Sequence, residues 1–394
     1  MKKFSSSAII LLALTSLLMT GCLRKPYACT DPLGCVEVAN AESIKIGTLL
    51  TMTTPDSPYG IDAVRGVEIA IADRKQVLGH SIELVKEDDL CSEAGGRAGA
   101  TKLASDPKMV GVIGTTCSSA TEPASKILSD AGMVLISPSS TAPSLTDPAT
   151  HQTGFLRTIY NDKVQGQSVA QFVFNVLGAR TMVTLHDGTA YPKQLQQAAC
   201  QSFEQLGGQC LQQIEITSGQ DMTSVLQGIA SSKPDVLYYP VYAEDGANIT
   251  KGAKAAGWSN VTLISSDGLL SPDFIKQTEP FCEGMYLSGP ANVTEPQDFL
   301  AKYQAKYGEA PIAVYHLQAY DAAMMLFDAI EKVAVSSNSN SISIPRQALR
   351  QALFATQGKQ GLAGELTCSA TGDCAQSNIE IFQVVNNDFK PIYP

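Results

Sequence analysis

Residues 111–128, with the sequence GVIGTTCSSATEPASKIL, decide how this chain folds. The apolar run at their start predicts a strand, the polar centre predicts a tight loop, and the remainder predicts a helix. The loop places Thr116, Cys117, Ser118 and Ser119 at the point where the helix begins. Hydroxyl groups and free backbone N–H groups at a helix start form a natural site for an anion, although Ser and Thr are also common helix caps.

The same strand–loop–helix unit recurs along the 394 residues, a length sufficient for two domains. The predicted strands of a first block lie at 44–50, 81–89, 109–116 and 133–139, and those of a second block lie at 181–187, 212–217, 235–242 and 261–267. Strands that alternate with helices are typical of parallel sheets with helices on both faces. The sequence therefore predicts an α/β protein with two doubly wound parallel-sheet lobes.

Polar side chains follow most of these strands. Ligands of doubly wound sheets bind at the carboxyl ends of strands, so these side chains are candidates for a binding site. In the first block they are mainly hydroxyls, and in the second block they are aromatic residues and one carboxylate. The candidates are Ser118, Ser119, Ser139, Ser140, Thr141, Tyr191, Tyr242 and Asp267. That division suits a zwitterion, with its carboxylate held on one side and its ammonium on the other.

Residues 1–21 have the pattern of a signal peptide, with Lys2 and Lys3 ahead of an apolar core. The core, at 8–19, is shorter than the about 20 residues of a membrane span. It ends in LLMTGC, where Gly21-Cys22 resembles the lipobox of bacterial lipoproteins. This resemblance implies a lipid on Cys22, and a plain secretory signal with an incidental cysteine is the alternative. We expect residues 22–43 to be a tether and the chain to be anchored to a membrane of the cell envelope, on its periplasmic or extracellular face, without spanning it.

The ten cysteines fit an oxidising compartment. With Cys22 set aside, pairing of sequence neighbours would join 29 with 35, 91 with 117, 200 with 210 and 368 with 374, and it would leave Cys282 unpaired. Sequence alone does not fix this connectivity. A structural zinc site is the alternative, but no Cys-x-x-Cys pair and no His-x-x-x-His accompanies these cysteines. We therefore expect no metal.

Composition and motifs do not favour nucleic-acid binding or catalysis. The formal net charge is −10 and no basic cluster interrupts the mature chain, which argues against nucleic acid as a partner. There is no G-x-S-x-G motif, no phosphate-binding loop and no dinucleotide fingerprint. Asp88 and Asp89 are expected to be structural acceptors in a loop, and His186-Asp187 a hydrogen-bonded pair at a strand end. We expect no enzyme and no cofactor; a hydrolase that uses Ser118 with His186 is the weakest alternative.

From about residue 44 onward the chain resembles the leucine/isoleucine/valine-binding family of periplasmic solute-binding proteins, the receptors of amino-acid ABC transporters. The motifs that carry the resemblance are, in order, PYGIDAVRGVEIAI, EDDLCSEA, IGTTCSSATEPAS, ISPSSTAPSLT, LHDGTAYPKQL and SSDGLLSPDF. The family has the type I periplasmic binding protein fold, a flytrap of two lobes joined by three crossovers. The resemblance implies crossovers near Thr158, Ser288 and Gly361, an N-terminal lobe at 44–158 and 289–361, and a C-terminal lobe at 159–288 and 362–394.

Matched position by position, the resemblance implies roles for single residues. Ser118 would bind the ligand carboxylate, and the Ser139 carbonyl would accept a hydrogen bond from the ligand ammonium. Thr141 would help to hold both the carboxylate and the ammonium. Asp267 stands where the family's leucine binders carry Glu, and is the implied counter-ion of the ammonium. Cys91 and Cys117 match a family disulfide that would hold the loop between the strand and the helix of residues 111–128. The implied ligand-binding set is Ser118, Ser119, Ser139, Thr141, Tyr59, Tyr191, Tyr242, Asp267 and Tyr315.

The expected function is that of a monomeric, lipid-anchored receptor that captures an amino acid, branched-chain or a related aliphatic one, and delivers it to a permease. The alternative is a ligand-sensing receptor for an amide or small carboxylate that acts with a signalling partner. The tyrosines could line an aliphatic slot with their rings or offer hydroxyls to a polar side chain. The sequence decides neither this point nor the choice between inner and outer membrane.

Overall fold

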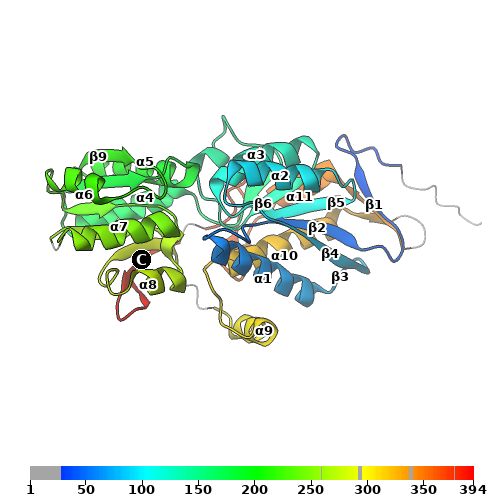
Figure 1. The fold of residues 1–394 in the computed structure, drawn as a ribbon. Coiled ribbons are helices and arrows are strands. Elements are labelled where there is room, and N and C mark those ends of the chain that lie inside the picture. Colours follow the sequence, from blue (N-terminus) through cyan, green and yellow to red (C-terminus); the bar gives the residue numbers. More distant parts are fainter. Residues whose placement is uncertain (1–27, 259, 292–294, 337–339, 377) are drawn as a thin grey trace, which may run out of the picture.

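The computed structural model describes residues 28–258, 260–291, 295–336, 340–376 and 378–394. These residues form two lobes that lie side by side, each built on one mainly parallel sheet (Figure 1). The predicted fold class is therefore confirmed. The predicted signal peptide and Cys22 lie outside the described residues. Within the described ranges, no helix combines the length and apolar character that a membrane crossing requires.

The sheet of the first lobe has six strands in the order β3-β4-β2-β5-β6-β7, all parallel except β3. Its strands are β2 (Ile44–Leu49), β3 (Gln76–Val77), β4 (His80–Glu87), β5 (Met109–Gly114), β6 (Val134–Ser137) and β7 (Phe155–Arg157). Every residue of β5 and β6 is buried, as expected for parallel strands covered on both faces. Because β5 and β6 are adjacent and parallel, their carboxyl ends lie side by side at one edge of the sheet.

Two pairs of helices cover this sheet. On one face pack α1 (Ser57–Arg74) and α10 (His316–Val333), and on the other α2 (Glu93–Ala104) and α3 (Ser118–Asp130). The helix α11 (Arg346–Phe354) adds Leu349 and Leu353 to the core. Gly66 allows α1 to approach α10 closely, because a Cβ there would lie 2.0 Å from the carbonyl oxygen of His316. This close packing fixes the first turn of α1, which carries Tyr59.

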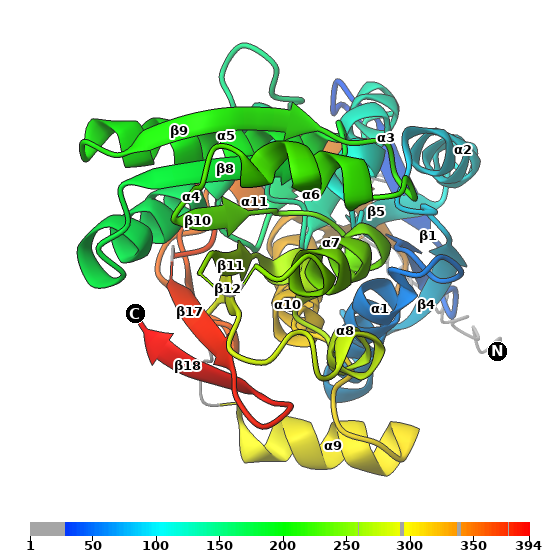
Figure 2. The ribbon, with the colours of Figure 1, turned by 60° about the vertical axis from the view of Figure 1, so that its left-hand side comes forward.

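The sheet of the second lobe has seven strands in the order β18-β17-β12-β11-β10-β8-β9. They are β8 (Thr181–His186), β9 (Gln209–Glu215), β10 (Val236–Tyr238), β11 (Thr262–Ser265), β12 (Tyr286–Pro290), β17 (Ile379–Val384) and β18 (Phe389–Tyr393). The last two strands run antiparallel at one edge of the sheet (Figure 2). Around the sheet pack α4 (Asp162–Gln171), a π-helical turn at Phe172–Val176, α5 (Ala190–Gln205), α6 (Thr223–Ala230), α7 (Ala243–Ala255) and α8 (Pro272–Thr278).

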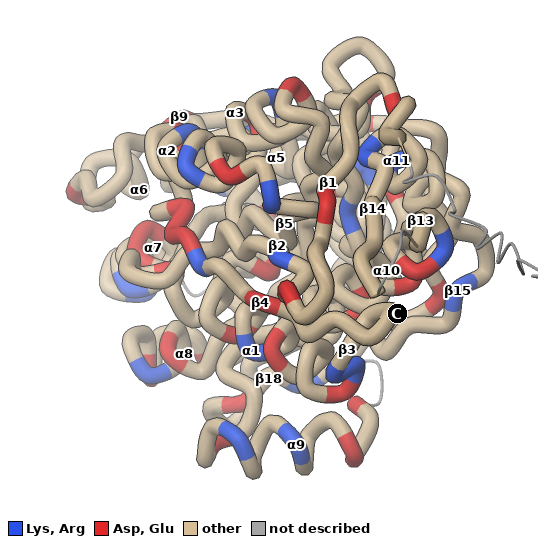
Figure 3. Tube along the Cα trace, turned by 90° about the vertical axis from the view of Figure 1, so that its right-hand side faces the viewer, with Lys and Arg blue, Asp and Glu red and all other residues tan. Residues whose placement is uncertain are grey.

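The expected tether is partly folded, which corrects the prediction for residues 22–43. β1 (Cys35–Val38) pairs with β14 (Ile342–Pro345), which also pairs with β13 (Val335–Ser336), and this small sheet lies at the end of the first lobe (Figure 3). Val36 and Val38 are buried. Two valines in alternation suffice to bury one face of a strand, although the segment holds few large apolar residues.

Two crossover positions also differ from the expectation. Ser288 lies inside β12, so the chain leaves the second sheet only after Pro290. The core of the first lobe contains Leu366, Cys368 and Cys374, although residues from 362 onward were expected in the second lobe. The reason is that Asp373, in the loop closed by Cys368 and Cys374, forms a β-bridge with Arg157 of β7. The chain joins the second sheet only at β17. The other division of the chain into lobes remains our proposal.

Several short elements complete the fold. The helix α9 (Gln297–Tyr307) packs Phe299 and Tyr303 against Ile69 of α1 and Leu317 of α10, and β15 (Lys359–Gln360) pairs with β16 (Glu365–Leu366). The disulfides are Cys29–Cys35, Cys91–Cys117, Cys200–Cys210 and Cys368–Cys374, and Cys282 is free and buried. The neighbour pairing is therefore confirmed.

Candidate functional site

The carboxyl ends of the two sheets face each other across a cavity of about 330 Å³ between the lobes. Seven of the nine predicted ligand-binding residues line it, together with three residues that adjoin Ser118 or Asp267 in the sequence. The lining residues are Tyr59, Thr116, Cys117, Ser118, Ser139, Tyr191, Tyr242, Asp267, Gly268 and Tyr315. The structure therefore brings together residues that lie more than 250 positions apart in the sequence.

One wall of the cavity is the anion loop, residues 115–118, between β5 and α3. Ser118 is the first residue of α3, is 1% exposed and lines the cavity, at a helix end where backbone amides lack intrahelical partners. Its Oγ accepts a hydrogen bond from the backbone N–H of Ala142 at 3.2 Å. The Ser139 hydroxyl donates to the carbonyl of Thr116 at 2.9 Å. Hydroxyls and helix amides at this wall suit a carboxylate.

The anion loop is held from behind by a buried carboxylate and a disulfide. Asp89 accepts hydrogen bonds from the backbone N–H of Thr116 (2.7 Å) and of Cys91 (2.9 Å), and from the hydroxyl of Thr51. Burial raises the pKa of the Asp89 carboxyl to about 6 against the opposing effect of these donors. The Cys91–Cys117 bond joins the same two segments covalently. Asp89 thus has the structural role expected for it, and it orients the loop.

Ser119 and Thr141 were predicted as ligand contacts but do not line the cavity. The Ser119 hydroxyl donates weakly to the carbonyl of Cys91, at 3.4 Å. Thr141 is 1% exposed, and its side chain interacts with the carboxyl of Asp162. Its carbonyl accepts from the backbone N–H of Asp162 at 3.0 Å, which places it directly beside the first turn of α4.

The opposite wall carries Asp267, which follows β11 and is 2% exposed. Its carboxylate accepts hydrogen bonds from three neutral donors: Gln165 Nε2 at 2.7 Å, Tyr191 OH at 2.7 Å and Tyr315 OH at 2.6 Å. Tyr315 reaches it from the first lobe. Its ring lies 5.8 Å from that of Tyr59, measured between centroids. Tyr59 also spans the cleft, donating to the carbonyl of Gly268 at 2.9 Å. The lobes are therefore in contact around the cavity.

A second buried carboxylate behind Asp267 was not predicted as part of the site. Asp162, the first residue of α4, is fully buried, and its hydrogen-bonding neighbour is the side chain of Thr141. Burial and the nearby charge of Asp267 raise its pKa well above the usual range for a carboxyl. The side chains of Tyr160 and Tyr238 are also buried here, beside Asp267 and Ser288 respectively. Asp162 follows β7, so the rule that pointed to the other strand ends could have found it.

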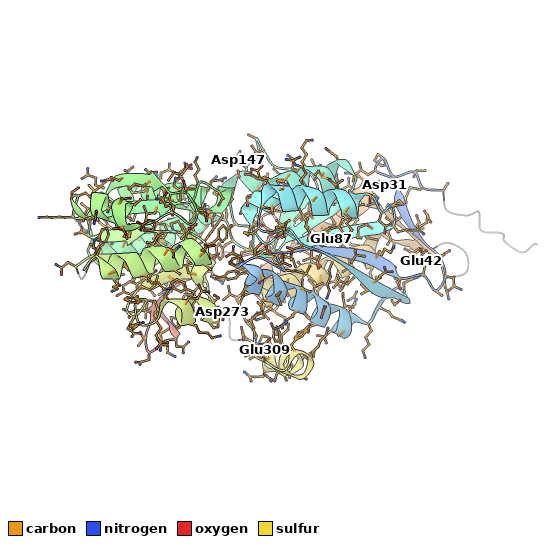
Figure 4. All side chains as sticks on the ribbon, viewed as in Figure 1. Asp31, Glu42, Glu87, Asp147, Asp273 and Glu309 are labelled. Carbon is orange, nitrogen blue, oxygen red and sulfur yellow. A yellow bond between two sulfur atoms is a disulfide. The ribbon has the colours of Figure 1, made fainter. Side chains whose placement is uncertain are left out.

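The mouth of the cleft is acidic. A second, larger hollow of about 630 Å³ adjoins the cavity at Tyr242, and carboxylates from both lobes line it: Asp56, Asp187, Glu244 and Asp245. Burial, together with the neighbouring carboxylates, raises the pKa of Asp56 to about 6. Other acidic side chains lie far apart on the two lobes, such as Asp31 and Glu42 at one end and Asp273 on the second lobe (Figure 4).

The residues of the alternative hydrolase do not meet. The ring of His186 accepts a hydrogen bond from the backbone N–H of Gly188 at 3.0 Å, and His186 does not line the cavity that Ser118 lines. The Asp187 carboxylate accepts from the backbone N–H and the hydroxyl of Thr189, so the hydrogen bonds of His186 and Asp187 go to Gly188 and Thr189 and not to each other as expected. Within the described ranges no group of three metal-ligating side chains is close enough to hold a metal ion.

Comparisons with known proteins agree with this architecture. The model of the periplasmic binding protein family matches residues 43–389. The Leu/Ile/Val-binding protein of Escherichia coli K12 is 28% identical over 279 residues, which cover 70% of this chain and 73% of that protein. The crystal structure of a leucine-binding protein from Thermotoga maritima superposes with a TM-score of 0.80 and 25% identity, over 89% of this chain and 97% of that one. A solute-binding protein of Rhodopseudomonas palustris in complex with benzoate has a TM-score of 0.77 and 22% identity, covering 89% and 96%.

Proposed function

The chain belongs to the periplasmic binding protein family, and on that premise we propose that it captures a small aliphatic amino acid between its lobes and delivers it to the permease of an ABC transporter. In this proposal the protein is an extracytoplasmic receptor and not an enzyme. It acts as a monomer held at the membrane by a lipid on Cys22. The relatives named for leucine, isoleucine and valine support this class of ligand.

The ligand carboxylate would be bound by the anion loop. Ser118 offers a hydroxyl and the N-terminal amides of α3, and the positive end of the helix dipole points to the same place. Each hydrogen bond to a charged group is worth about 1.5–3 kcal/mol. Three or four of them, after the cost of ordering and desolvation, reach the roughly −8 kcal/mol of micromolar binding.

The ligand ammonium would be bound by Asp267, with Asp162 behind it. Both carboxylates are buried, and the groups that donate to Asp267 are all neutral. An ammonium supplies the missing positive charge. A benzoate-like ligand would instead add a third carboxylate to this region without a cation, which is costly in a buried site. This contrast supports a zwitterion over an aromatic acid.

The ligand side chain would lie against tyrosine rings. Three of the four cavity tyrosines use their hydroxyls on protein partners: Tyr59 on Gly268, Tyr191 on Asp267 and Tyr315 on Asp267. Their rings, and not their hydroxyls, are therefore available to the ligand. This supports an aliphatic slot, the first of the two options that the sequence left open.

The observation that carries the proposal is the single cavity in which Ser118 and Asp267 meet from different lobes. Isothermal titration calorimetry with the twenty amino acids and benzoate tests it. We expect heat and micromolar affinity for leucine, isoleucine or valine, and none for benzoate. The absence of binding by every amino acid would overturn the proposal. Incorporation of labelled fatty acid into the wild-type protein, but not into Cys22→Ser, tests the lipid anchor.

A further inference from the structure

The loop at residues 140–146, called here the Thr141 loop, joins two features of the closed cleft. It carries Thr141, which lies beside Asp162 of the proposed site. It also carries Ser144, which exchanges two hydrogen bonds with the side chain of Gln194 on the second lobe, each 2.9 Å long. The position of this loop therefore affects both the ligand region and the contact between the lobes.

The side chain that bonds the Thr141 loop at the most places is that of Arg157, although Ser118, Ser137 and Thr121 also contact the loop. Arg157 is 0% exposed, and its guanidinium donates to the carbonyl of Ser140 at 3.1 Å and to the carbonyl of Ala142 at 3.0 Å. It also donates to the hydroxyl of Thr146 at 2.6 Å. A guanidinium is a planar group with donors in fixed directions, so these three bonds restrict both the place and the orientation of the loop.

The guanidinium is in turn oriented by Asp373. Arg157 Nε donates to Asp373 Oδ1 at 2.5 Å, and the other carboxylate oxygen accepts from Asn161 Nδ2 at 3.4 Å. Asp373 comes from a part of the chain that is 216 residues away in sequence. Its side chain is 33% exposed, whereas that of Arg157 is fully buried. Without Asp373 the buried guanidinium would lose its only carboxylate partner among the described residues.

Asp373 lies inside a small covalent ring. The Cys368–Cys374 disulfide closes a loop with a sequence separation of 6. The ring is fastened to β7 by backbone hydrogen bonds on both sides of Asp373: Arg157 N–H donates to Gly372 at 2.9 Å, and Cys374 N–H donates to Arg157 at 3.1 Å. A closed ring has fewer conformations than an open segment, so the carboxylate stays at one place.

We propose that the Cys368–Cys374 ring is a positioning device for ligand binding, acting through Asp373 and Arg157 on the Thr141 loop. None of these residues lines the cavity. The proposal deepens the proposed function and rests on it for its ligand readout. It makes the affinity for an amino acid depend on a disulfide and on a carboxylate that never touch the ligand.

The test compares Asp373→Asn, the double variant Cys368→Ser/Cys374→Ser, and their combination, using leucine as the probe in calorimetry. The matched control is Cys29→Ser/Cys35→Ser, because that disulfide has the same sequence separation of 6 but lies at β1. We expect about three- to ten-fold weaker binding for Asp373→Asn and for the ring double variant. The combination should be no weaker than the worse of the two, since both act through Arg157. The control should bind within two-fold of wild type.

Hydrogen exchange of the 140–146 amides in the ligand-free protein gives a second readout. We expect faster exchange in Asp373→Asn and in the ring variant, and unchanged exchange in the control. Equal loss of affinity in the ring variant and the control, or unchanged exchange in Asp373→Asn, would overturn the proposal. If wild type binds no amino acid, the proposed function fails, and the exchange experiment still tests the link between ring and loop.

Discussion

Replacing Asp267 by Asn should abolish tight binding without harming the fold. The carboxylate is 2% exposed, and its three protein donors, Gln165, Tyr191 and Tyr315, are neutral. In the variant, a bound ammonium would be buried without its opposing charge. Leaving one member of such a pair unpaired costs about 2–5 kcal/mol. At 1.36 kcal/mol for each factor of ten, the affinity should fall roughly 30-fold to several thousand-fold.

The thermal stability of the ligand-free Asp267→Asn variant, in contrast to its affinity, should stay the same or rise. Asp267 is one of the charges that raise the pKa of Asp162, so the substitution removes a repulsion between two buried carboxyl groups. We therefore expect Asp267→Asn to melt at the same temperature as wild type or higher, measured by differential scanning calorimetry without ligand. Loss of affinity together with retained stability separates a binding role from a folding role.

A matched substitution sharpens this test. Asp187→Asn also removes a carboxylate after a strand of the second lobe, but Asp187 lies at the acidic mouth and not in the cavity. The affinity of Asp187→Asn for leucine, measured by calorimetry, should stay within about three-fold of wild type, because Asp187 does not line the cavity. The reasoning is refuted if Asp267→Asn binds leucine within two-fold of wild type, or if both variants lose affinity equally.

Three further substitutions probe other parts of the molecule. Ser118→Ala removes a hydroxyl from the anion loop and should weaken leucine binding by about 10- to 150-fold in calorimetry, which corresponds to one hydrogen bond to a charged group; an unchanged affinity would place the carboxylate elsewhere. Gln194→Ala removes both hydrogen bonds to Ser144 and should speed ligand dissociation about three- to ten-fold in stopped-flow measurements, with little change in association; a slower association alone would contradict this. Burial would lower the pKa of His316, but the neighbouring carboxylates of Asp62 and Glu295 outweigh this effect and raise the pKa to about 9. Protonated His316 therefore stabilises the folded protein fully below about pH 6.5, and this contribution is lost as the pH rises through 9. His316→Gln should therefore lack this pH-dependent loss of unfolding free energy between pH 6.5 and 9 in urea titrations, and a parallel profile would contradict the assignment.

The fold was accessible from the sequence because its signals are local. Apolar runs such as 109–114 and polar breaks such as the anion loop alternate along the chain, and the strand-end rule then pointed to Ser118 and Asp267. The pairing of cysteines was accessible for the same reason, since each bonded pair lies close in sequence. Where a signal was short, as in the two valines of β1, the segment was assigned to a tether.

The support of the site was not accessible, because it depends on contacts between distant segments. Arg157 and Asp373 are separated by 216 residues, and neither lies in a motif that suggests the other. Asp162 stands in an ordinary helix start after Asn161, whose side chain caps α4 by accepting from Lys163 N–H. Its neighbour Asp267 is about 100 residues away in sequence, so its place beside the site becomes evident only from the folded chain. Sequence patterns identify which side chains end a strand, but tertiary packing decides which of them lose water.

That loss of water explains how closure can depend on the ligand. When the lobes meet, Asp162 and Asp267 are both buried, with no cationic side chain bonded to either within the described ranges. Burying two nearby carboxylates is unfavourable unless one takes up a proton or a cation enters. An open form keeps them hydrated, so the empty protein should favour opening. The ammonium of an amino acid supplies the cation only in the closed form, and a ligand shifts an equilibrium by its difference in affinity for the two states. In the proposed function, the two carboxyl groups would then favour closure around a zwitterion over closure of the empty receptor, most strongly at a pH at which Asp162 is ionised.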